Sequence, residues 1–186
     1  MVKLNKIYTK TGDRGDTALG NGERVLKDNL RVSAYGNVDE LNASIGVVTL
    51  YVTSGLKRKL KNIQNDLFDL GADLCVPISE DNIDRLRVSS NQIEAIEAEI
   101  DEMNNILEPL NSFVLPGGCK AATFLHLART ICRRAERSIV SLRSKEEINE
   151  NTLVYLNRLS DWLFVASRVE NQENSTEVLW SPGKNK

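Results

Sequence analysis

The chain has 186 residues, which is the length of one ordinary domain, and its composition of 41% hydrophobic and 27% charged residues indicates a folded protein rather than a disordered one. The net charge of −2 argues against a dedicated nucleic-acid binder. No apolar run approaches the roughly 18 residues that a membrane-spanning helix needs, and the first 15 residues lack the apolar segment of a signal peptide. Cys75, Cys119 and Cys132 form no CxxC motif, so we expect reduced thiols in a cytoplasmic protein.

Apolar residues recur at intervals of three and four in five stretches, which is the spacing that lines one face of an α-helix. These stretches are 38–52, 60–74, 93–107, 121–142 and 156–166. The alternation averages about 3.5 residues, the seam spacing of left-handed helical bundles. With only 5% aromatic residues, the sequence predicts an all-α protein rather than a β-sandwich.

Capping and stop signals predict where these helices begin and end. Asn37, followed by Glu40, predicts the N-cap of the first helix, and Ser89 begins the same motif ahead of the third. Pro77 is expected to end the second helix and Pro109 the third.

Residues 1–35 do not fit the helical pattern. They contain a short strand-like run, Leu4–Tyr8, and four of the 11 glycines fall between positions 12 and 22. A segment of this length without regular structure is usually functional or disordered. We therefore expect one domain over 1–186, with an N-terminal segment 1–35, a helical bundle 36–172 and a tail 173–186.

Residues 9–17 read Thr-Lys-Thr-Gly-Asp-Arg-Gly-Asp-Thr. Glycines free the backbone amides, hydroxyls donate and cationic side chains add charge, which together are typical of a phosphate-binding loop. The segment is not a Walker motif, because it lacks GxxxxGK[ST]. A flexible polar N-terminus is the equally weighted alternative.

Residues 129–145 hold six basic residues against one acidic residue. Arg129, Arg133 and Glu136 fall on one arc of the fourth predicted helix, at the border of its apolar stripe. A triphosphate would satisfy these guanidinium groups, and so would carboxylates on a neighbouring helix, the reading favoured for a basic helix taken alone. Asp39 is interpreted either as a carboxylate at a helix N-terminus or as a partner of one of these arginines.

Three further features are ambiguous on their own. Phe113 begins an apolar run before Pro116-Gly117-Gly118, and it either packs into the core or offers an apolar surface to a large flat ligand. His126 is the only histidine, so a zinc site is not expected, and a polar core or surface position is the ordinary explanation. One face of the fifth predicted helix is either the wall of a site or a solvent face, and it carries Asn157, Ser160, Asp161, Phe164 and Arg168.

Five segments taken together resemble a known family. TKTGDRGDT, AYGNVDELNA, FVLPGG, ARTICRRAER and YLNRLSDWLF occur in the order found in PduO-type ATP:cob(I)alamin adenosyltransferases, and the resemblance covers residues 5–170. It implies an all-α, five-helix, left-handed up-and-down bundle of ferritin-like type. It also implies a homotrimer with ATP between adjacent subunits.

The resemblance assigns roles to particular residues. The nucleotide would contact Thr9, Lys10, Thr11, Gly12, Thr17, Ala18, Lys27, Arg133, Arg134, Glu136, Arg137 and Asn157. Asp39 and Arg129 match residues that pair across the subunit interface. Phe113 matches the hydrophobic residue beneath the corrin ring, so Asp39, Arg129, Arg133 and Phe113 are the candidate catalytic residues. No metal ligand is assigned, although magnesium is expected on the phosphates.

The implied reaction transfers the 5′-deoxyadenosyl group of ATP to cob(I)alamin and releases triphosphate. The substrate itself is the nucleophile, which is consistent with the absence of a catalytic triad. The implied partners are a separate cob(II)alamin reductase and an adenosylcobalamin-dependent enzyme, with no nucleic acid and no membrane. Two other functions stay open: a non-catalytic adenosylcobalamin carrier and an ATP-binding trimeric scaffold.

Overall fold

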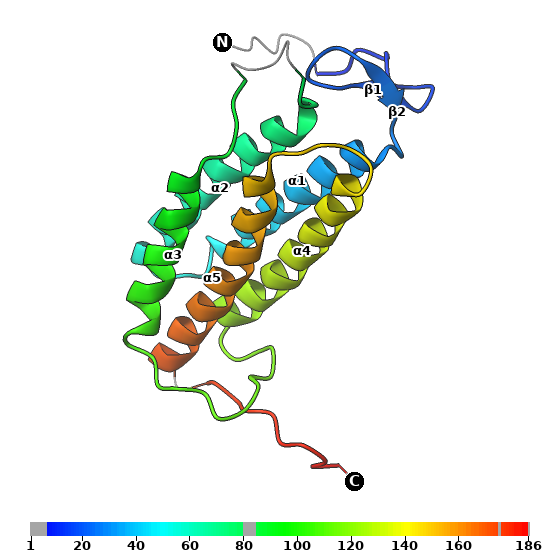
Figure 1. Cartoon of the computed structure of the whole chain (residues 1–186). Helices are drawn as coiled ribbons and strands as arrows, with labels where there is room; N and C mark the ends of the chain where they lie inside the picture. Colours follow the sequence, from blue (N-terminus) through cyan, green and yellow to red (C-terminus); the bar gives the residue numbers. More distant parts are fainter. Residues whose placement is uncertain (1–6, 80–84, 175, 186) are drawn as a thin grey trace.

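The computed structural model of the chain describes residues 7–79, 85–174 and 176–185. Five helices account for most of these residues (Figure 1): α1 (Leu30–Val48), α2 (Ser54–Cys75), α3 (Ser90–Asn104), α4 (Lys120–Arg143) and α5 (Glu150–Asn174). The predicted all-α five-helix fold is confirmed. In the described ranges no helix combines the length and the apolar character that crossing a membrane requires.

A small antiparallel hairpin, which no sequence pattern indicated, precedes the helices. Strands β1 (Asp16–Ala18) and β2 (Arg24–Leu26) pair with Thr17 opposite Val25. Of the strand-like run Leu4–Tyr8, residues 4–6 lie outside the described residues, and Ile7 and Tyr8 belong to neither strand. The hairpin therefore arises from a different part of the N-terminal segment.

The predicted apolar stripes form the core. Every stripe residue of α2, α4 and α5 is buried, and on α4 Leu125, Cys132 and Ile139 have no exposed surface. Each fully buried Leu or Ile side chain contributes roughly 1.5–3 kcal/mol relative to an exposed one. The spacing of apolar residues at intervals of three and four thus identified the core-facing sides of these helices correctly.

Helix α5 is the central helix of the bundle, because it packs against α4, α3 and α2. Its two large aromatic residues, Tyr155 and Trp162, are fully buried. Each satisfies its polar atom: Tyr155 Oη donates to Asp66 Oδ2 at 2.9 Å, and Trp162 Nε1 donates to Glu99 Oε2 at 2.7 Å. These bonds fix α5 against α2 and α3.

The predicted N-cap at Asn37 is wrong, because α1 begins earlier. Its N-cap is Asn29, whose side chain accepts a hydrogen bond from Arg31 N at 2.7 Å. Asn37 lies inside the helix and donates from Nδ2 to Ser33 O at 2.8 Å. The buried face of α1 continues upstream through Ala34 to Arg31. Because Arg31 is charged, the apolar pattern in the sequence stops before the helix does.

The remaining helix ends agree only in part with the sequence signals. Ser89 forms the predicted capping box at the start of α3. Pro77 follows the end of α2, as expected, but α3 ends at Asn104, so Pro109 lies beyond the helix and does not stop it. Helix α5 continues to Asn174 before the tail begins.

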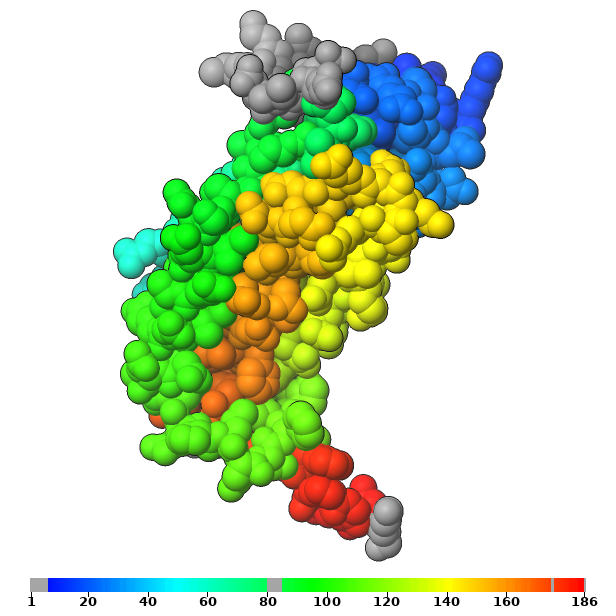
Figure 2. Space-filling view, viewed as in Figure 1, coloured from blue at the N-terminus to red at the C-terminus, as the bar shows by residue number. Residues whose placement is uncertain are grey.

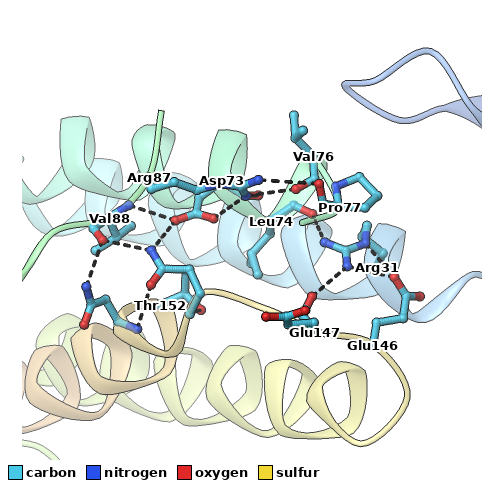
Figure 3. Close-up of polar contacts among 12 residues, drawn as sticks. Arg31, Asp73, Leu74, Val76, Pro77, Arg87, Val88, Glu146, Glu147 and Thr152 are labelled. Carbon is cyan, nitrogen blue, oxygen red and sulfur yellow. Dashed lines mark hydrogen bonds and ion pairs between the residues drawn. The ribbon is translucent and has the colours of Figure 1, made fainter. Parts of the chain in front are cut away.

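A buried polar network closes the end of the bundle nearest the hairpin (Figure 3). The carboxylate of Asp73 accepts hydrogen bonds from Arg87 Nη1 at 2.7 Å, Val88 N at 2.8 Å and Asn149 Nδ2 at 2.7 Å. Arg31 is buried nearby and donates from Nη2 to Glu146 Oε2 at 2.7 Å. The network ties the α2–α3 and α4–α5 connections to the first turn of α1.

Candidate functional site

The N-terminal loop, residues 9–15, is held in place by the hairpin. Arg24 on β2 donates from Nη2 to Thr11 O at 2.8 Å and from Nε to Asp16 Oδ2 at 2.9 Å. The Arg24 hydrogen bond holds the pKa of the Asp16 carboxyl below its usual value. Sequence reasoning missed Arg24, because only the strand pairing reveals that it faces the loop.

The loop presents cations and backbone groups to solvent. Lys10 adopts a left-handed backbone conformation with φ of 62°, which is unusual for a residue other than glycine. A Cβ at Gly12 would lie 3.2 Å from Lys27 Nζ and 3.1 Å from Asp16 O, so only glycine fits there without displacing its neighbours. Lys10 and Lys27 form no ion pair with a described residue, as expected of groups that bind an external anion. The other predicted residues of this segment lie here too: Thr9, Thr17 and Ala18.

The cationic residues of α4 differ in their partners. Arg134 pairs with Glu40 on α1, a carboxylate on a neighbouring helix. Arg133 Nη1 lies 3.7 Å from Glu136 Oε2, one helical turn away, which is a weak contact. The Arg137 side chain forms no ion pair with any residue in the described part of the chain. Arg133 and Arg137 therefore remain available to an anion.

Glu136 and Asn157 meet between α4 and α5. Asn157 Nδ2 donates to Glu136 Oε1 at 2.9 Å. This contact brings together two residues that the resemblance assigned to the nucleotide. On the polar face of α5, Asn157 is partly buried and contacts Glu136, whereas Ser160 and Arg168 are buried and Arg168 pairs with Glu177 in the tail.

Arg129 lies further toward the start of α4, and its Nε is buried with no hydrogen-bond partner among the described residues. Burial, and then the nearby charge of Arg133, lower the pKa of Arg129. Asp39 is exposed on α1 and forms no ion pair with a described residue. Because α1 begins at Leu30, Asp39 is outside its first turn, and the helix-N-terminus interpretation of this carboxylate is wrong.

An apolar pocket of about 530 Å³ opens beside Arg129. It is lined by Leu110, Ser112, Phe113, Val114, Arg129 and Phe164. Phe113 is 77% exposed, so the core-packing alternative for this residue is wrong. His126 lies in the core close by, with its ring 6.2 Å from that of Phe164 and its Nε2 3.3 Å from Ser167 Oγ.

The C-terminal tail, residues 176–185, contacts the connection 105–118 between α3 and α4, which carries Phe113. Val114 and Leu179 form an antiparallel bridge, and Trp180 N donates to Phe113 O at 2.7 Å. The rings of Phe113 and Trp180 lie 6.0 Å apart. The sequence suggested only a tail here, because a single bridge leaves no periodic pattern.

The N-terminal loop and the pocket lined by Phe113 lie at opposite ends of the molecule. Figures 1 and 2 show the hairpin at one end of the bundle and the 105–118 connection with the C-terminal tail at the other. Helix α4, with 24 residues, spans about 36 Å between these ends. Within one chain, the N-terminal loop and Phe113 therefore cannot contact the same small ligand.

Comparisons with known proteins identify the family of this chain and agree with its helical fold. The family model described as "Cobalamin adenosyltransferase" matches residues 7–170. The corrinoid adenosyltransferase of Mycobacterium leprae is 44% identical over 98% of this chain and 98% of its own length, and that of Bacillus subtilis is 44% identical over 89% and 86%. A variant of the PduO-type ATP:corrinoid adenosyltransferase from Lactobacillus reuteri, solved with cobalamin and ATP, superimposes with a TM-score of 0.90 at 38% identity, covering 94% of this chain and 99% of that one. The chain belongs to the cobalamin adenosyltransferase family.

Proposed function

We propose that this protein transfers the 5′-deoxyadenosyl group of ATP to cob(I)alamin and releases triphosphate. The cobalt supplies the electron pair of the new cobalt–carbon bond, and the bond between C5′ and its phosphate oxygen breaks with its electron pair on the triphosphate. The observation that carries the proposal is the occurrence, in one chain, of a glycine-containing cationic loop and an apolar pocket with a buried arginine Nε that has no partner among the described residues.

The protein's part in this reaction is to position ATP and neutralise its charge, because the nucleophile belongs to the substrate. Lys10, Lys27, Arg133 and Arg137 supply cations that no described carboxylate satisfies fully. Backbone amides of the glycine-rich loop add donors for the phosphates. These groups lower the free energy of the departing triphosphate most where its charge develops.

The apolar pocket suits the corrin ring. Phe113 is exposed, bulky and without a donor atom, so it would exclude water and the cofactor's own base from the lower face of cobalt. Removing that axial ligand makes reduction of cob(II)alamin easier. The electron comes from a separate reductase, and an adenosylcobalamin-dependent enzyme is the proposed acceptor of the product.

We propose that the working unit is a homotrimer in which each site uses two chains. The support is geometric: one chain separates the N-terminal loop from Phe113 by the length of α4, and a symmetric ring of chains can bring the loop of one beside the pocket of the next. Asp39, which forms no ion pair with a described residue, would then meet the buried Nε of Arg129 across the interface.

Magnesium would bind together with ATP and not at a metal site of the protein alone. No cluster of three or more His, Cys, Asp or Glu side chains that could hold a metal occurs among the described residues. Glu136 already contacts Asn157 and Arg133. Mg²⁺ keeps several water ligands and favours phosphate oxygens, so ATP would hold it without a protein cage. We place the protein in the cytoplasm, where Cys75, Cys119 and Cys132, all free here, would stay reduced.

The experiment is an absorbance assay with purified protein, ATP and chemically reduced cobalamin. Adenosyl transfer predicts a light-sensitive cobalt–carbon product and one triphosphate released per product. Omitting ATP, or replacing it with ADP, provides the control for non-enzymatic change. Triphosphate release without the photolabile product, or binding of ready-made adenosylcobalamin without turnover, would favour a scaffold or a carrier instead.

A further inference from the structure

A chain of polar contacts runs from α3 through α5 to the cations of α4. We propose that Arg158 is a positioning residue of the nucleotide site: it fixes the side-chain amide of Asn157 and, through that amide, the carboxylate of Glu136 and the guanidinium of Arg133. This inference rests on the proposed function, because it gives those three residues an ATP molecule to bind.

The amide of Asn157 lies between two groups of opposite hydrogen-bonding character. Arg158 Nη1 donates to Asn157 Oδ1 at 2.8 Å, and Asn157 Nδ2 donates to Glu136 Oε1 at 2.9 Å. A guanidinium can only donate, and a carboxylate can only accept. A flipped amide would place two donors together on one side and two acceptors together on the other. The two neighbours therefore permit one orientation, in which one N–H and one lone pair of Asn157 remain for a ligand.

The same contacts orient the carboxylate of Glu136. Asn157 engages Oε1, while Oε2 lies 3.7 Å from Arg133 Nη1. Arg133 is about half exposed, and this is its only ion pair with a described residue. Without Asn157 on the other oxygen, the carboxylate would be less constrained, and so would its contact with Arg133. The orientation thus passes from Arg158 to a cation proposed to bind phosphate.

Arg158 is itself anchored to α3, which carries none of the proposed nucleotide-binding residues. Its Nε donates to Glu97 Oε1 at 2.6 Å. Both residues line a surface cavity of about 320 Å³ with Ile100, Asp101 and Asp161, so Arg158 lies among carboxylates on its outer side. With Nε on Glu97 and Nη1 on Asn157, the planar guanidinium is held at two points.

The ion pair between Arg158 and Glu97 is exposed, so a structural role and a positioning role predict different effects of mutation. Arg158 and Glu97 are both more than a third exposed, and ion pairs of this kind add little to folding stability. Arg143 and Glu150 offer a matched control, because they join α4 to α5 at 2.8 Å, are similarly exposed and touch none of the proposed site residues. A structural role would make the two pairs equivalent, whereas a positioning role would not.

The test measures ATP affinity by calorimetry without cobalamin, together with the kcat and KM of adenosyl transfer and the Tm. R158Q should raise both the Kd and the KM for ATP by about tenfold with little change in Tm, and R143Q should change neither. R158K, which retains a charged donor group but not the planar fork, should recover part of the affinity, and E97Q, which still accepts from Arg158, should have a smaller effect than R158Q.

A double-mutant cycle identifies the route of the effect. If Arg158 acts through Asn157, R158Q should add nothing further to N157A. Additive losses, or equal ATP affinities for R158Q and R143Q, would overturn the proposal. Failure of the wild-type protein to bind ATP or to form the cobalt–carbon bond is a different outcome, because it overturns the proposed function and the positioning role with it.

Discussion

Arg129 and Phe113 line one pocket, and the Nε of Arg129 is buried at its edge with no partner among the described residues. An unsatisfied buried donor is costly, particularly on a charged group. We take its presence beside an exposed phenylalanine as support for the proposed trimer. In that trimer the group that would accept from Arg129 is the carboxylate of Asp39 from a neighbouring chain.

Arg133→Ala should lower kcat/KM for adenosyl transfer by about 10- to 150-fold. The reason is the loss of a charge-assisted hydrogen bond to phosphate, which is worth roughly 1.5–3 kcal/mol. Steady-state kinetics with reduced cobalamin measure the effect, and Arg143→Ala, on the same helix but outside the site, serves as the control. Turnover and ATP affinity close to those of the wild-type protein would contradict the assignment.

Phe113→Ala should abolish most adenosylation that starts from cob(II)alamin while leaving ATP affinity and Tm nearly unchanged. Truncation opens space for water or the cofactor's base below cobalt, and the exposed ring contributes little to the core. Phe113→His should be worse, because imidazole can itself ligate cobalt. The absorbance spectrum of bound cob(II)alamin reports its coordination number, and a Tm that falls in step with activity would refute the role.

Asp73→Ala should destabilise the fold by about 3–5 kcal/mol, because it leaves Arg87, Val88 N and Asn149 without their shared acceptor in the interior. Urea denaturation measures this change. Glu102→Ala, which removes an exposed carboxylate paired with Lys59, should keep the wild-type midpoint. Equal midpoints for the two variants would show that the network in Figure 3 is not a major source of stability.

His126 should make stability depend on pH. Burial, and then the charge of Arg129, lower its pKa below the ordinary value of 6.5. The unfolded state therefore takes up the proton first, so the free energy of unfolding falls as the pH drops below 6.5 toward the lower folded pKa. His126→Gln should show a flatter Tm profile than the wild-type protein across this window. Parallel profiles would exclude His126 as the cause.

The sequence predicted most of the fold, whereas several contacts around the candidate site depend on partners that it does not reveal. The 3-4 stripes located all five core faces, because burial imposes that spacing on any packed helix. The start of α1 was misplaced, because Arg31 is buried on the apolar face and pairs with Glu146, a contact between residues far apart in the chain. Arg24, the Leu179 bridge and Arg158 were missed for the same reason: their roles depend on partners that no local pattern reveals.

The most direct test of a site shared between chains is complementation. Lys27→Ala disables the hairpin end and Arg129→Ala disables the pocket end, so each homotrimer should be nearly inactive. In trimers assembled from an equal mixture, about a quarter of the interfaces would join an intact loop of one chain to an intact pocket of the next. We predict that co-expression of the two variants restores turnover to about that fraction of the wild-type rate. Mixed trimers that are no more active than the separate variants would contradict the account.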